Sequence, residues 1–60
     1  MKVLRVERVS DATGLAKSTL YKYMAAGMFP KPIHLGPRCV GWLEQEIFAW
    51  IEERAKERVA

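Results

Sequence analysis

The sequence predicts a mainly α-helical chain with three helices and one small β-hairpin. Gly14 and Gly27 each follow a short segment that can form a helix, and both are permissive residues for a helix end. Two short alternating segments then flank Gly36-Pro37, as in a hairpin. After the hairpin, apolar residues recur at helical spacing, which indicates the third helix. The expected elements, in one domain that covers residues 1–60, are helices at about 7–13, 17–26 and 44–58 and a hairpin at about 33–42.

Length and composition exclude several classes of protein. Sixty residues leave no room for a separate catalytic domain, and half of them are hydrophobic, which suffices for one small core. No apolar run approaches the length of a membrane span, and the first residues do not resemble a signal peptide. A single cysteine cannot form an internal disulfide. We therefore expect a cytoplasmic protein without a membrane partner.

The first helix is predicted from apolar residues at intervals of three that end at Gly14. It follows a short extended lead-in at residues 2–5. A later start with Ser10 as the N-cap would leave barely one helical turn. Thr13 is expected to supply a structural hydroxyl at the turn. The residues that should face the second helix are Val6, Val9, Ala12 and Leu15.

The second helix has one apolar and one polar face when its residues are spaced about 100° apart. Leu20 and Met24 lie on the inner face, flanked by Tyr21, Tyr23 and the stem of Lys17. Two helices joined by a tight turn are typical of a helix-turn-helix whose second helix enters the major groove of DNA. The alternative is that the outer residues are simply solvated at a helix start. This short, polar and cationic outer face consists of Ser18, Thr19, Lys22 and Ala25.

The hairpin has the size of a wing. Arg38 lies at its tip, where a long cationic side chain could reach a phosphate or a minor groove. Alternatively, Arg38 keeps an exposed strand from pairing with other chains. His34 should point outward, and because it and Cys39 lack further metal-type neighbours, we expect no metal site and a packed thiol. The side chains expected to point inward are Ile33, Leu35, Val40 and Trp42.

The last helix has acidic residues near its start and basic residues near its end, which complement the helix dipole. Glu52 and Lys56 can form one ion pair. Phe48 lies at the edge of the apolar stripe, so it either tucks beside the hairpin, which we expect, or offers a partner a hydrophobic contact. The stripe consists of Leu43, Ile47, Trp50 and Ile51. Other large residues expected in the core are Met28, Phe29 and Trp42.

Charge is distributed unevenly along the chain. Residues 1–42 hold seven Lys or Arg and two acidic residues, whereas residues 43–60 hold five Glu and three basic residues. Residues 12–43 contain no acidic residue. A cationic run is often only a solvated surface, but one that coincides with a helix-turn-helix is the expected electrostatic footprint of a protein that binds a polyanion.

Short motifs span nearly the whole chain in a fixed order: Thr13-Gly14-Leu15, Ser18-Thr19-Leu20-Tyr21, Phe29-Pro30-Lys31-Pro32, Leu35-Gly36, Val40-Gly41-Trp42, and Glu46 followed by Trp50-Ile51. Together they resemble the AlpA family of prophage regulatory proteins. The resemblance implies a MerR-like winged helix-turn-helix and a regulator of a prophage or integrative element, bacterial or phage-encoded. Ala16 departs from the family where a serine is frequent, and Phe48 where a polar residue is usual.

We therefore expect a sequence-specific transcriptional regulator that binds double-stranded DNA, with no enzymatic activity, catalytic residue, cofactor, metal or small-molecule ligand. The residues expected to contact phosphates are Lys17, Lys22, Lys31 and Arg38, together with the hydroxyl of Tyr21. The residues expected to contact base edges are Ser18, Thr19 and Lys22. On the wing, His34 is a further expected DNA contact.

A single module of this size covers only a few base pairs, so we expect further copies of the chain on DNA. Two alternatives remain open. One is an excisionase-type recombination directionality factor that binds and bends DNA. The other is a small interaction module that acts on a recombinase through Phe48 and the last helix.

Overall fold

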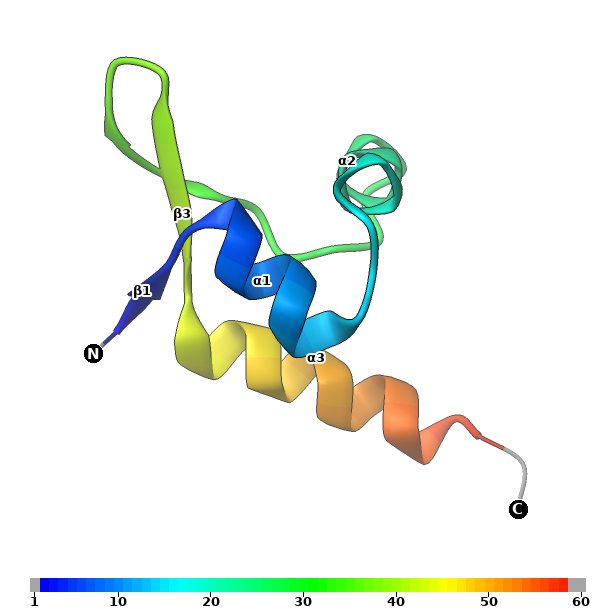
Figure 1. Cartoon of the computed structure of the whole chain (residues 1–60). Coiled ribbons are helices and arrows are strands. Elements are labelled where there is room, and N and C mark those ends of the chain that lie inside the picture. Colours follow the sequence, from blue (N-terminus) through cyan, green and yellow to red (C-terminus); the bar gives the residue numbers. More distant parts are fainter. Residues whose placement is uncertain (1, 59–60) are drawn as a thin grey trace.

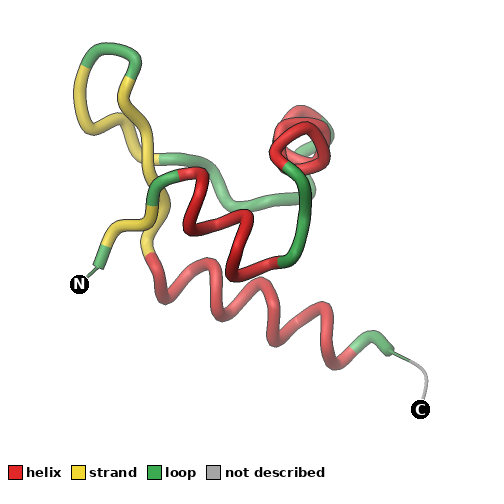
Figure 2. The backbone as a smooth tube through the Cα atoms, viewed as in Figure 1, coloured by secondary structure: helices red, strands yellow, loops and turns green. Residues whose placement is uncertain are grey.

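The computed structural model describes residues 2–58 of the chain. Three α-helices and three antiparallel strands follow one another as shown in Figure 1 and, coloured by type, in Figure 2. The helices lie within two residues of the ranges that the sequence predicts. The elements are β1 Val3–Leu4, α1 Val6–Thr13, α2 Lys17–Ala25, β2 Ile33–Gly36, β3 Cys39–Leu43 and α3 Glu44–Lys56.

Helix α1 packs against both of the other helices. In Figure 1, α3 runs along one side of α1, while α2 stands beyond the turn at the end of α1. The hairpin formed by β2 and β3 rises on the same side of α1 as α2, away from α3. Two parts of the chain therefore project from a base formed by α1, α3 and β1.

The N-terminal residues form a strand, where the sequence predicted only an extended lead-in. β1 pairs antiparallel with β3, with Leu4 opposite Trp42. The N–H of Glu44 donates to the carbonyl of Lys2 at 2.8 Å. The sheet order is β1-β3-β2, so β1 is an edge strand. Two residues are too few to show an alternating pattern, and β3 supplies the partner that makes them a strand.

The core takes one fully buried side chain from each helix and one from β3. Leu4 and Phe29 complete it at 8% and 7% exposure. Ala12, which was expected inside, is exposed because it faces a hollow beside α3 rather than α2. The fully buried side chains are Val9, Leu20, Ile47 and Trp42.

Phe29 packs between the two tryptophans. Its ring centroid lies 6.3 Å from that of Trp42 and 4.8 Å from that of Trp50, and both contacts are edge-on. The indole N–H of Trp42 donates to the carbonyl of Pro30 at 2.9 Å, and that of Trp50 donates to the carbonyl of Met28 at 2.9 Å. The two indoles thus hold the backbone on both sides of Phe29, in the segment that joins α2 to β2.

The inward orientation expected of Ile33 and Leu35 is wrong. Their side chains are 37% and 48% exposed, whereas Trp42 is fully buried. The hairpin extends past the helices, and β2 packs chiefly against β3, so the side chains of β2 lie outside the core. An irregular register between His34 and Gly36 also interrupts the alternation on which the prediction depended.

The positions expected of Phe48 and Met28 are also wrong. Phe48 is 48% exposed and lines the hollow beside β1, because two residues of helix turn it to the opposite side of α3 from Trp50. Met28 is 47% exposed. Trp50 holds the backbone carbonyl of Met28, so this residue is fixed in place although its side chain stays outside the core.

The ion pairs on α3 differ from the one predicted. Lys56 lies 3.9 Å from Glu53 rather than pairing with Glu52, and Arg54 lies 3.7 Å from Glu57. These pairs are largely exposed, so each contributes little to stability.

Gly41→Ala should destabilise the protein, because the added Cβ would lie 2.6 Å from Val3 Cγ1 and 3.1 Å from both Leu35 Cδ1 and the carbonyl oxygen of Leu4. We expect a loss of about 1–3 kcal/mol in the free energy of unfolding, measured with urea. Gly36→Ala is the matched control, since its nearest neighbouring side-chain atom is 3.9 Å away. Equal destabilisation by both substitutions would contradict the packing argument.

Candidate nucleic-acid interface

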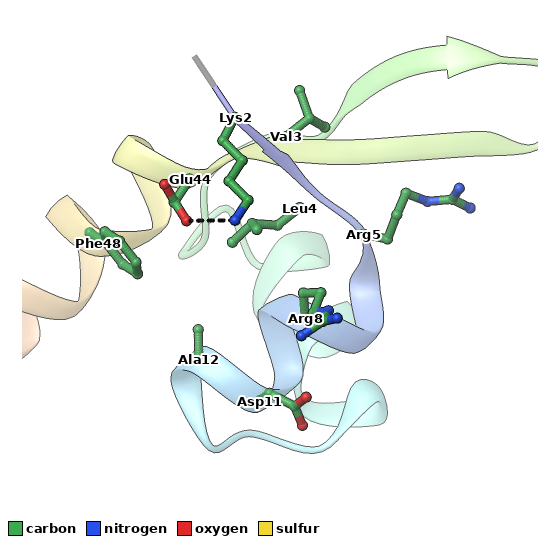
Figure 3. Close-up of a pocket in the computed structure, with 9 residues that line it drawn as sticks. All are labelled: Lys2, Val3, Leu4, Arg5, Arg8, Asp11, Ala12, Glu44 and Phe48. Carbon is green, nitrogen blue, oxygen red and sulfur yellow. Dashed lines mark ion pairs between the residues drawn. The ribbon is translucent and has the colours of Figure 1, made fainter.

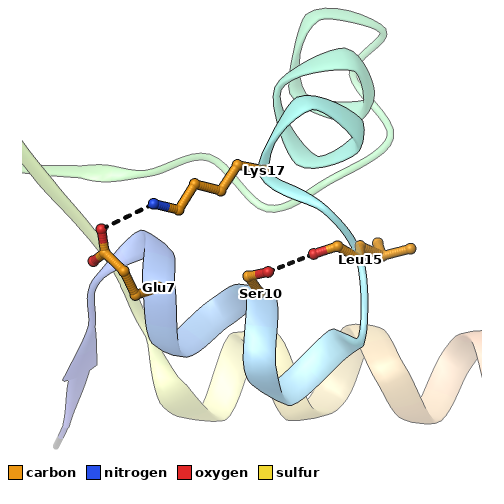
Figure 4. Close-up of polar contacts among 4 residues, drawn as sticks. All are labelled: Glu7, Ser10, Leu15 and Lys17. Atoms are coloured by element: carbon orange, nitrogen blue, oxygen red, sulfur yellow. Dashed lines mark hydrogen bonds and ion pairs between the residues drawn. The ribbon is translucent and has the colours of Figure 1, made fainter.

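Two side-chain hydroxyls hold the turn between α1 and α2. Gly14 ends α1 with φ 74°, and its N–H donates to the carbonyl of Ser10 at 2.8 Å. The hydroxyl of Thr13 donates to the carbonyl of Val9 at 2.8 Å and accepts from the N–H of Leu15 at 3.3 Å. The hydroxyl of Ser10 donates to the carbonyl of Leu15 at 2.6 Å (Figure 4). These bonds fix the turn and therefore the direction in which α2 leaves it.

Helix α2 begins without a side-chain cap, as the sequence predicts. Ala16 stands at the N-cap in extended geometry, and its carbonyl accepts from the N–H of Leu20 at 3.0 Å. Alanine has no side-chain acceptor for the N–H groups of the first turn. The positive end of the helix dipole is therefore left open to an external anion.

The exposed face of α2 is a stripe of residues three and four positions apart. Tyr21 belongs to it with 53% exposure, although it was expected on the inner flank. Tyr23 turns inward as expected, with its ring centroid 6.3 Å from that of Trp50. Thr19, which was expected outside, lies partly buried at the flank. The stripe consists of Ser18, Tyr21, Lys22 and Ala25.

Glu7 on α1 lies beside the start of α2. Its carboxylate is 3.3 Å from Nζ of Lys17, and both side chains are largely exposed (Figure 4). A hydrogen bond from its own backbone and the ammonium group of Lys17 hold the pKa of Glu7 below its usual value. The sequence prediction missed this pair, because it treated the cationic segment apart from the acid of the preceding helix. The positive charge of Lys17 is therefore partly neutralised by Glu7.

The hairpin carries a cation at its tip. Arg38 lies in the turn between β2 and β3 with φ 58°. Its side chain is exposed, as are those of His34 and Lys31. The residues expected to bind DNA thus form two groups, one on α2 and one on the hairpin with the segment before it. Helix α2 and the hairpin project on the same side in Figure 1, whereas Lys31 lies in the segment that joins them.

Within residues 2–58, no helix is long and apolar enough to cross a membrane. The same residues hold no group of three or more His, Cys, Asp or Glu side chains that could bind a metal ion. Cys39 is a partly buried free thiol.

Three helices, a fixed turn between the first two and a small antiparallel hairpin are consistent with a winged helix-turn-helix. Comparison with known families defines the chain further. It belongs to the AlpA family, since the family model described as Prophage CP4-57 regulatory protein (AlpA) matches residues 2–55. The resemblance noted in the sequence is therefore confirmed.

Two relatives match nearly all of this chain. The DNA-binding transcriptional activator AlpA of Escherichia coli (strain K12) is 36% identical over 62 aligned positions, which cover 93% of this chain and 89% of that protein. The protein ORF88 of Enterobacteria phage P4, described as uncharacterized, is 39% identical over 57 residues, or 95% of this chain. This chain spans 65% of the length of the phage protein.

Ser10→Ala should loosen the turn, because it removes the hydroxyl that donates to the carbonyl of Leu15. We expect a loss of about 1 kcal/mol in the free energy of unfolding, measured with urea. Ser18→Ala, on the exposed stripe of α2, is the control and should change stability by much less. If Ser10→Ala proved as mild as the control, the hydroxyl would not be holding the turn.

Proposed function

We propose that this chain is a sequence-specific regulator of a prophage or integrative element that binds double-stranded DNA as a MerR-like winged helix-turn-helix. The observation that carries the proposal is that α2 and the hairpin project on one side, within a stretch of sequence that contains no acidic residue. A surface of this kind attracts the phosphate backbone of DNA.

Helix α2 has dimensions that suit the major groove. Its nine residues span about 14 Å, and the groove is about 12 Å wide. In the proposed complex, Ser18 and Lys22 read base edges from the exposed stripe and Thr19 does so from its partly buried flank, since hydroxyl and ammonium groups match the donors and acceptors there. Tyr21 gives its exposed hydroxyl to a phosphate. The uncapped N–H groups at the start of α2 can bind a second phosphate.

The hairpin and the segment before it supply backbone contacts. Arg38, at the tip, reaches a phosphate or the minor groove, while Lys31 and His34 lie nearer the hairpin base. These contacts carry no base information by themselves, but they set the orientation of α2 in its groove. The Escherichia coli relative is named as a DNA-binding transcriptional activator, which supports the same function for this chain.

One copy reads only a few base pairs, so we propose that several copies occupy neighbouring sites rather than that a stable dimer is built into the fold. Sedimentation without DNA should accordingly show a monomer. A recombination directionality factor that bends DNA would use the same surface.

The decisive experiment is fluorescence anisotropy with DNA from around the gene of this protein and any neighbouring integrase gene, against scrambled DNA, at two salt concentrations. Specific binding should favour the native fragment by about tenfold or more and weaken as salt rises. Absence of binding even at low salt would contradict the proposal that α2 enters the major groove.

Lys22→Ala should weaken DNA binding and reduce the salt dependence by about one unit in the slope of log affinity against log salt, because one phosphate-neutralising charge is lost. The matched control is Lys56→Ala, which removes an equally charged side chain from α3. An equal effect of the two substitutions would mean that net charge, and not the face of α2, governs binding.

Glu7→Gln should strengthen DNA binding about threefold at low salt, because it frees Lys17 and removes a carboxylate that repels phosphate. The salt slope should become steeper as Lys17 gains a phosphate partner. Asp11→Gln on the same helix is the control for net charge. Weaker binding by Glu7→Gln would show instead that the ion pair holds Lys17 in its productive position.

A further inference from the structure

A hollow with a volume of about 520 Å³ lies between β1, α1 and α3, and none of its lining residues belongs to α2 or the hairpin turn (Figure 3). Leu4, Ala12 and Phe48 give it apolar surface, and Arg5 and Arg8 give it positive charge. We propose that this hollow is a docking site for an extended peptide segment of another protein, in which an apolar side chain is flanked by acidic ones.

β1 offers an open backbone edge beside the hollow. The N–H of Glu44 donates to the carbonyl of Lys2, and Leu4 pairs with Trp42, so the residues on both sides of Val3 turn their backbone groups toward β3. The alternation of an antiparallel pair then points the N–H and C=O of Val3 away from β3. A segment laid along β1 can form two hydrogen bonds there, and its alternate side chains enter the hollow.

Phe48 provides the apolar contact. Its side chain is 48% exposed on α3, and Figure 3 shows it facing the hollow that Ala12 of α1 and Leu4 of β1 also line. The side chain of Ala12 is too small to cover the ring of Phe48. An apolar side chain of the partner that enters between the two helices would remove this aromatic surface from water.

The charges around the hollow favour an acidic partner. Nζ of Lys2 lies 4.0 Å from a carboxylate oxygen of Glu44, so these two offset each other (Figure 3). In the part of the chain that the structure describes, no ion pair joins Arg5 or Arg8 to an acidic side chain. Apart from the pair of Lys2 and Glu44, the lining therefore carries two guanidinium groups, of Arg5 and Arg8, and one carboxylate, of Asp11. Guanidinium groups bind carboxylates in a bidentate way, which favours Asp or Glu beside the apolar side chain of the partner.

A protein partner fits the hollow better than DNA or a second copy does. Phosphates would meet the carboxylates of Asp11 and Glu44 and gain nothing from Phe48. Within residues 2–58, the segment richest in acidic residues is α3, which is a helix and not an extended strand. The proposal does not depend on DNA binding, since the hollow shares no residue with the exposed stripe of α2.

The test begins with selection of a random peptide display library against the immobilised full chain, followed by fluorescence anisotropy of the best peptides after synthesis. Selected peptides should combine a bulky apolar residue with at least one acidic neighbour. Phe48→Ala and Arg8→Gln should each weaken their binding about tenfold. The matched controls are Met28→Ala, whose side chain is 47% exposed, and Lys56→Gln; both should bind as the wild type does.

Three further readouts distinguish binding in the hollow from binding elsewhere on the chain. The amide of Val3 should become protected from hydrogen exchange when a selected peptide binds, because only strand addition engages that N–H. Arg8→Glu should bind a version of the peptide with lysines in place of its acidic residues. Phe48→Ala and Arg8→Gln should retain the thermal unfolding and the DNA affinity of the wild type, so a failure of the DNA-binding proposal would leave this test intact.

Several results would overturn the proposal. These are a library that yields no binding peptide, peptides that bind Phe48→Ala and Arg8→Gln as tightly as the wild type, and loss of DNA affinity in Arg8→Gln without loss of peptide binding. Self-association of the chain that Phe48→Ala abolishes would assign the hollow to a second copy instead.

Discussion

The packing of Phe29 between Trp42 and Trp50 is the interaction on which the rest of the structure depends. The two indole N–H groups hold the carbonyls of Pro30 and Met28, one on each side of the phenyl ring. This segment joins α2 to the hairpin, so the same contacts that bury the largest side chains also set the two projecting parts relative to each other. In so small a chain, a few aromatic residues thus supply both the core and the geometry of the surface.

The start of α2 combines an uncapped helix end with a nearby carboxylate. Its N-cap, Ala16, leaves the first N–H groups without a side-chain partner, and the carboxylate of Glu7 stands close enough to engage Lys17. The fold thereby presents a positive helix end with one negative group beside it. A nearby acid of this kind limits attraction to any polyanion and leaves more of the discrimination to shape and to base contacts.

The sequence was sufficient where local chemistry decides the structure. Glycine adopts the positive φ of a helix end without strain, and α1 ends at Gly14 as predicted. The sequence-based prediction failed where contacts with distant residues decide the structure. β1 is a strand because it pairs with β3, and Leu35 is exposed because the hairpin extends beyond the core. Tyr21 was misplaced because the helical wheel alone does not say which flank of α2 meets α3. The hydroxyl of Ser10 bonds to the loop after its own helix, which no spacing rule indicates.

The hairpin is supported at one end only. Trp42 is buried at its base, whereas Leu35 and Arg38 are exposed toward its tip. The free end of a hairpin that is held at its base is displaced most, so a given thermal force moves Arg38 further than it moves Trp42. α2, by contrast, is clamped at its start by the turn and beyond its end by the aromatic cluster. In the proposed complex, α2 is therefore the rigid element that sets the register on DNA. The hairpin is the flexible element, which can follow a duplex of varying curvature.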